Sequence, residues 1–181
     1  MGKFLLLFLF LPLSLLGQNF PVDTHSGKIT YSEDILVKDA SESELYDRAK
    51  AWIRHSSPPD QVRLKEDTPN GLLTGTTFTQ VAAFNGKAKN TYALWYTVMI
   101  RVEDDRYWYR LSGFLLQPQP SLQLAASPER MARKQPLEEL VFPKKAEGRS
   151  ANPTALPAKA EKAIMALLED LKAYLLTGGE R

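Results

Sequence analysis

The stretch from Asn90 to Leu116 constrains the fold more than any other part of this chain. It consists of two largely apolar segments on either side of the acidic sequence Glu103–Arg106. If the segments fold back about this turn as antiparallel strands, opposite residues share one side of the sheet. The residues that collect on one side are Val102 with Tyr107, Ile100 with Tyr109, Val98 with Leu111, Tyr96 with Gly113, and Leu94 with Leu115. The sequence therefore predicts a hairpin with this side in the protein core.

The opposite side of the predicted hairpin combines aromatic, apolar and basic residues. Its pairs are Arg101 with Trp108, Met99 with Arg110, Thr97 with Ser112, and Trp95 with Phe114. Tryptophan and arginine dominate protein interfaces. We also expect Arg101 to lie over Trp108, a cation–π contact of about 0.5–1 kcal/mol when it is exposed. The candidate ligand-binding or partner-binding residues are therefore Trp95, Met99, Arg101, Trp108, Arg110 and Phe114.

The segments before this hairpin predict one more helix and three more strands. Alternating residues in Gly27–Lys38 indicate a first strand, and a capping-box sequence opens a helix at about Glu42–Arg54. Val62–Glu66 indicates a short strand, and the threonine-rich Leu72–Phe84 a longer one in which Gly75 suggests a bulge. This order predicts an α+β fold, an antiparallel sheet of about five strands with helices on one face.

The C-terminal third changes in character after the hairpin. Six prolines interrupt residues 117–156, which we expect to form a mostly irregular connection, with Leu137–Phe142 apolar enough to dock on the domain. Residues 157–176 predict an amphipathic helix that covers the apolar face of the sheet. Its stripe consists of Ile164, Leu167, Leu168, Leu171, Tyr174 and Leu175.

The N-terminus is typical of an export signal. Lys3 supplies the positive charge, Phe4–Leu16 the apolar run, and Gly17 the small residue before a cleavage that leaves Gln18 first. The run is too short for a bilayer core of about 30 Å, which takes roughly 20 residues. Leu15 departs from the preferred small residue, so an uncleaved anchor is the alternative. We expect a periplasmic or secreted protein with no membrane span after cleavage.

The predicted organisation has four parts. These are a signal peptide at 1–17, an α+β domain at 22–116, the proline-rich connection at 117–156, and the C-terminal helix at 157–176.

Charge and residue content exclude several functions. Formal net charge is +2, and removal of Lys3 lowers it to +1, too little to indicate a nucleic-acid partner. The chain has no cysteine, which excludes disulfides, thiolate metal ligands and a thiol nucleophile. His25 and His55 are the two histidines, and neither has a second ligand at a recognised spacing, so we expect no metal. No glycine-rich phosphate loop indicates a nucleotide, and we expect no cofactor.

Two acidic stretches leave an enzymatic alternative open. Asp23–Ser26 contains the residue types of a catalytic triad, and Glu103–Asp105 the carboxylates that glycoside hydrolysis uses. A triad is assembled in space, however, and carboxylates at a hairpin tip are usually solvated. The leading interpretation is a non-enzymatic binding or structural domain with a protein or small ligand on the aromatic side. An envelope hydrolase with a site near Asp23 and His25 is the alternative, and a homodimer through the sheet face is a third interpretation.

Several of these segments resemble a known family. Gly27–Glu33 and Ser43–Trp52 are similar to the opening of a bacterial domain of unknown function, number four-four-six-eight, described as having a TATA-binding-protein-like fold. Tyr96–Val102 and Asp105–Tyr109 resemble its closing hairpin, and the resemblance covers about Val22–Leu116. It implies an exported bacterial protein with that fold. It implies no catalytic residue, because none is established for the family, and fold alone does not carry function.

Overall fold

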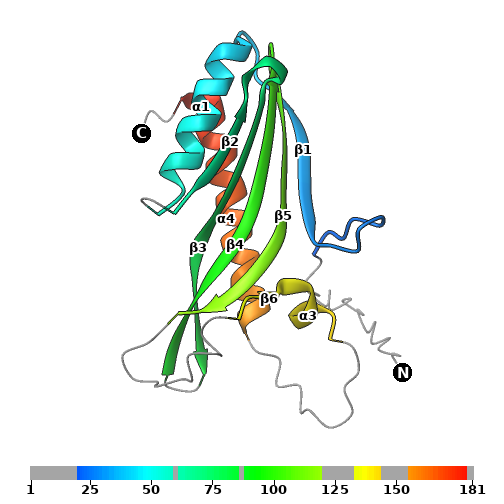
Figure 1. Cartoon of the computed structure of the whole chain (residues 1–181), viewed down its shortest axis with the longest axis vertical. Coiled ribbons are helices and arrows are strands. Elements are labelled where there is room, and N and C mark those ends of the chain that lie inside the picture. The colour runs from blue at the N-terminus through cyan, green and yellow to red at the C-terminus, as the bar shows by residue number, and fades with distance from the viewer. Residues whose placement is uncertain (1–19, 59–60, 86–87, 120–132, 144–154, 179–181) are drawn as a thin grey trace, which may run out of the picture.

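A single antiparallel sheet carries two long helices on one of its faces (Figure 1). The computed structural model describes residues 20–58, 61–85, 88–119, 133–143 and 155–178. The predicted signal peptide at 1–17 lies outside the described residues. Within the described part of the chain, no helix combines the length and hydropathy needed to cross a membrane.

The sheet confirms the predicted α+β class and the predicted order of elements. The strands are β1 (Thr30–Leu36), β2 (Arg63–Asp67), β3 (Leu72–Asn85), β4 (Ala88–Glu103), β5 (Arg106–Pro118) and β6 (Gln135–Pro136). The helical elements are α1 (Glu42–His55), the short 3-10 turn η1 (Thr68–Asn70), α3 (Leu137–Val141) and α4 (Leu156–Thr177). In space the strand order is β1-β5-β4-β3-β2, and β6 extends the β1 edge of β5. The connection after β5 therefore contributes a strand and a helix that the sequence pattern did not indicate.

The tip of the predicted hairpin is also the anchor of α1. Asp104 Oδ1 accepts a hydrogen bond of 2.8 Å from the Glu42 amide at the helix N-terminus, where a negative charge is favourable. The Asp105 amide donates to the Ala40 carbonyl at 2.9 Å. Asp105 holds a φ of 63°, a left-handed conformation that aspartate tolerates better than most residues. The Ser41 hydroxyl caps the helix by accepting from the Glu44 amide at 3.3 Å, whereas the Glu44 carboxylate pairs with Arg48.

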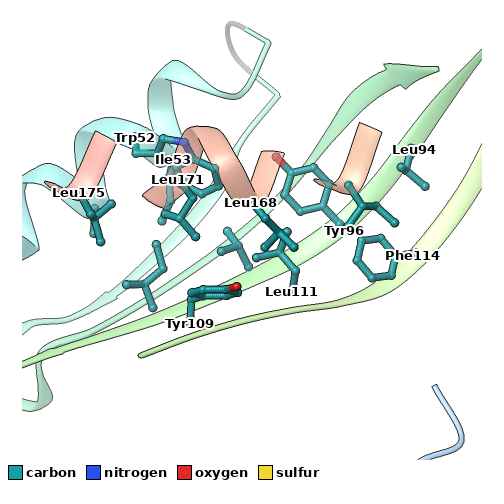
Figure 2. Close-up of a cluster of buried hydrophobic side chains, with 14 of the residues drawn as sticks. Trp52, Ile53, Leu94, Tyr96, Tyr109, Leu111, Phe114, Leu168, Leu171 and Leu175 are labelled. Carbon is teal, nitrogen blue, oxygen red and sulfur yellow. The ribbon is translucent and has the colours of Figure 1, made fainter. Parts of the chain in front are cut away.

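The core lies between the sheet and the two helices. Figure 2 shows Tyr96, Tyr109 and Leu111 of the sheet facing the side chains of α1 and α4. The helix residues that are fully shielded here are Leu45, Ala49, Trp52, Ile53, Ala160, Ile164, Leu171 and Leu175. The two helices are also joined by a hydrogen bond of 2.9 Å from Trp52 Nε1 to Asp170 Oδ2. Leu137 of α3 is fully buried in the same core, so this apolar segment does dock on the domain.

A bulge makes the register at the far end of the hairpin differ from the expected one. Pairing follows the prediction from the tip to Thr97 and Ser112, but beyond it Trp95 pairs with Leu115 and Leu94 with Leu116. The extra residue in β5 follows Gly113, whose φ of +68° suits a glycine. One added residue exchanges the two faces of the strand. Phe114, expected on the outer side, is therefore fully buried, and Leu115 takes its place opposite Trp95.

Gly75 has a different role from the bulge that the sequence suggested. It pairs regularly with Val98 on one side and Leu64 on the other. A Cβ at this position would lie 2.8 Å from Ile53 Cγ2 and 3.2 Å from Val98 Cγ1. The glycine therefore lets α1 approach the sheet closely.

We expect Gly75→Ala to lower the free energy of unfolding by about 1–2 kcal/mol, measured by urea titration. The added methyl overpacks the core, and this loss exceeds the gain from a less flexible unfolded chain. Ser112→Thr adds one methyl on the opposite face and should change stability by less than about 0.5 kcal/mol. A Gly75→Ala protein as stable as the parent would contradict this account of the helix–sheet packing.

Candidate functional site

The face of the sheet turned away from α1 and α4, called here the outer face, carries ordered rows of side chains. The strand register aligns three rows: Asp34, Trp108, Arg101, Leu72 and Asp67; then Ser32, Arg110, Met99, Thr74 and Lys65; then Thr30, Ser112, Thr97, Thr76 and Arg63. A fourth row holds Leu115, Trp95 and Phe78. The core face is filled by apolar side chains, whereas these rows mix aromatic, hydroxyl and charged groups.

Five of the six candidate residues lie together on the outer face. Trp95, Met99 and Trp108 are half-buried, and Arg101 and Arg110 are exposed. Phe114 is the exception, because the bulge turns it into the core.

The cation beside Trp108 differs from the expected one. Arg101 is the cross-strand partner of Trp108, as expected, but the guanidinium carbon of Arg110 is the one that lies over the ring, 5.4 Å from its centroid. Arg110 and Trp108 are two positions apart on β5, so both point to the same face. Trp108 therefore has a basic neighbour on its own strand.

Trp95 lies in a denser cluster that the sequence pattern did not indicate. Lys134 Nζ lies 3.5 Å from the centroid of the Trp95 ring, and the Phe78 ring is 4.8 Å away, centroid to centroid. Trp95 Nε1 also donates a hydrogen bond of 2.9 Å to Gln117 Oε1. These contacts fix the indole in one orientation on the strand surface.

A pocket of about 280 Å³ opens beside Trp95. Its lining is Gln61, Val62, Arg63, Thr76, Trp95 and Lys134. The pocket exists because β2 begins only at Arg63, while β3 continues for nine residues beyond Thr76. Desolvation lowers the pKa of the Lys134 ammonium below its usual range, and the positive charge of Arg63 acts in the same direction.

The alternative site near Asp23 and His25 is an exposed turn. Asp23 Oδ1 accepts from the Ser26 amide at 2.7 Å, the Ser26 hydroxyl at 3.0 Å and the His25 amide at 3.0 Å. These bonds, the one from the Ser26 amide most strongly, lower the pKa of Asp23. The His25 Nδ1 atom lies 3.5 Å from Thr24 Oγ1, whereas the Asp23 carboxylate accepts hydrogen bonds from the backbone and from the Ser26 hydroxyl. The hydrogen bonds of Asp23 therefore stabilise the turn to which it belongs.

The same turn nevertheless borders the outer face. Asp23 and His25 line a hollow of about 490 Å³ together with Arg110 and Ser112 of β5. His55 lies elsewhere, at the end of α1, where its ring stacks on Tyr174 with centroids 6.0 Å apart. In the described ranges, no group of three or more histidine or acidic residues is placed to hold a metal ion.

Solved structures share this fold. The chain is similar to a TBP-like protein from Parabacteroides distasonis, with a TM-score of 0.65 and 17% identity over 87% of this chain and 97% of that one. It is also similar to a DUF4468 family protein from Bacteroides ovatus, with a TM-score of 0.65 and 14% identity over 88% of this chain and 91% of that one. At such identities the likeness shows the fold alone. No curated protein matches the chain.

A family model gives the identity of the domain. It matches residues 31–117, which run from the second residue of β1 to the last but one of β5 and include α1 but not β6 or α4. The structural likeness extends further and takes in most of the chain. The domain at residues 31–117 belongs to the family described as "Domain of unknown function (DUF4468) with TBP-like fold".

Proposed function

We propose that this chain is an exported, non-enzymatic binding domain whose outer face holds an acidic protein or a small anionic ligand. The observation that carries this proposal is the set of side chains on that face. Trp95, Met99 and Trp108 lie there among arginines, on strands whose other face is fixed by the core. Rigid strands present such groups at little cost in conformational freedom.

The charge of the outer face favours an anionic partner. Its first three rows contain four basic residues and two acidic ones: Arg63, Lys65, Arg101 and Arg110 against Asp34 and Asp67. This excess of two positive charges equals the formal net charge of the whole chain, +2, so the remaining charges of the chain sum to zero. Electrostatic complementarity raises association rates and selects partners. Two copies paired through this face would each bring the same excess of positive charge to the interface, which disfavours a homodimer there.

The acidic stretches have structural roles, which favours a binding domain over a hydrolase. The Asp23 carboxylate is engaged by its own turn, and Asp104 caps α1. A hydrolase with a nucleophile–base pair needs a base held by a third group and facing the nucleophile. The described contacts of His25 do not form such a chain.

Photocrosslinking tests the outer face directly. A benzophenone amino acid at Thr97, in the centre of the face, should form adducts in the cells that make the protein, detected by mass spectrometry. The same group at Glu169, exposed on α4, is the matched control and should form few adducts. Trp95→Ala together with Trp108→Ala should abolish the Thr97 adducts, because the aromatic anchors of the interface are lost.

Thermal unfolding of the double variant provides the control for folding. Equal adducts at Thr97 and Glu169, or Thr97 adducts that persist in the folded double variant, would contradict the proposed function.

Export is the second part of the proposal, supported by Lys3 and the apolar run Phe4–Leu16. The protein recovered from the periplasmic or secreted fraction should have the mass of a chain that begins at Gln18. Leu9→Arg interrupts the apolar run and should keep the full-length chain in the cytosol. Recovery of the unaltered chain in the cytosol, or uncleaved in the membrane fraction, would contradict cleavage and release.

A further inference from the structure

The pocket beside Trp95 brings two cations from distant parts of the chain to one hollow. Arg63 is the first residue of β2, and Lys134 directly precedes β6. Both line the pocket, and both are exposed. Because they lie 71 positions apart in the sequence, the fold, rather than local sequence, places them together.

Among the residues that the structure describes, the lining contains no acidic group to balance these charges. The other lining groups are the Gln61 amide, the Val62 side chain, the Thr76 hydroxyl and the Trp95 indole. The ion pairs found in the described part of the chain join Arg48 to Glu44, Lys50 to Glu66 and Lys172 to Glu33. Neither Arg63 nor Lys134 takes part in them. Two like charges held close together in a hollow favour an anion between them.

We propose that this pocket binds the carboxylate or phosphate group of a small organic anion. The inference rests on the proposed function, because Trp95, Thr76 and Arg63 belong to the outer face, and it names the chemistry of one ligand that this face takes.

The groups present match the chemistry of an oxyanion. The Arg63 guanidinium has a planar fork of donors that fits two oxygens of a carboxylate or phosphate. The Lys134 ammonium is a compact point charge that the Trp95 ring already holds in place at 3.5 Å. The Thr76 hydroxyl and Gln61 amide offer further donors.

The size of the pocket limits the occupant. Its volume of about 280 Å³ lies just below the usual range for ligand pockets, roughly 300–1,000 Å³. A molecule such as a sugar acid or a sugar phosphate is of suitable size, with its uncharged part against Val62 or the indole edge. Desolvation is the larger cause of the lowered pKa of Lys134 and the positive charge of Arg63 the smaller one, and a bound anion would raise this pKa.

The indole N–H groups of the protein give a direct test. The chain has three tryptophans, so ¹⁵N labelling gives three indole signals in an NMR spectrum, and Trp95→Phe identifies that of Trp95. Glucose 6-phosphate, gluconate and neutral glucose are titrated into the purified protein at constant ionic strength. We expect a saturable shift of the Trp95 signal with at least one anion, no shift with glucose, and little change at the buried Trp52. A shift with glucose 6-phosphate alone would identify a phosphate site, and a shift with gluconate alone a carboxylate site.

Charge-removing variants complete the test. Arg63→Gln and Lys134→Gln should each weaken binding of the active anion by roughly tenfold or more, since each removes a charge-assisted bond. Lys162→Gln removes the same charge from the exposed side of α4 and should leave the titration unchanged. The inference is overturned if neither anion shifts the Trp95 signal, if glucose shifts it equally, or if both pocket variants bind like the parent protein.

The two proposals fail separately. Crosslinks at Thr97 with no anion-dependent shift would discard the anion pocket and leave the proposed function standing. An anion-dependent shift abolished by both pocket substitutions, with no Thr97 crosslinks, would support the pocket and discard the wider interface.

Discussion

The structure depends on the burial of one face of the sheet beneath α1 and α4. Trp52, Ile53, Leu171 and Leu175 from the helices pack there, and large side chains such as Ile100 are fully shielded from solvent. Each buried aliphatic or phenylalanine side chain contributes about 1.5–3 kcal/mol relative to leaving it exposed. Because side chains alternate along a strand, assigning one set to the core fixes the other set on the outer face. The outer face is therefore free to carry tryptophan, threonine and arginine that the core does not require.

Much of this architecture is predictable from local patterns in the sequence. Alternation on both sides of the acidic turn gives the hairpin register as far as Thr97 and Ser112, and the capping box locates the start of α1. Beyond Gly113 the prediction was wrong about which side chains face the core. Residues 114–116 are all apolar, so either phase of the alternation is acceptable, and periodicity cannot detect a slip of one residue. A glycine inside the strand was the available signal.

The contacts that build the candidate site are harder to predict because they are long-range. Trp95 and Trp108 follow from strand alternation, but Lys134 reaches Trp95 from a proline-rich connection with no periodic pattern. Arg63 becomes a pocket residue only because β2 is much shorter than β3. The acidic turn is a similar case, since Asp104 binds the α1 N-terminus across 62 positions. Local sequence indicates which residues share a strand face, whereas the chain path decides which segments meet on it.

Iodide quenching of tryptophan fluorescence tests the two-faced sheet most directly. Trp52 is fully buried and hydrogen-bonded to Asp170, whereas Trp95 and Trp108 lie on the outer face. Iodide does not enter a packed core, and the basic outer face attracts it. The account predicts strong quenching of the parent protein and very weak quenching of a Trp95→Phe, Trp108→Phe variant, whose only tryptophan is Trp52. Quenching of that variant as strong as in the parent protein would contradict the assignment of the two faces.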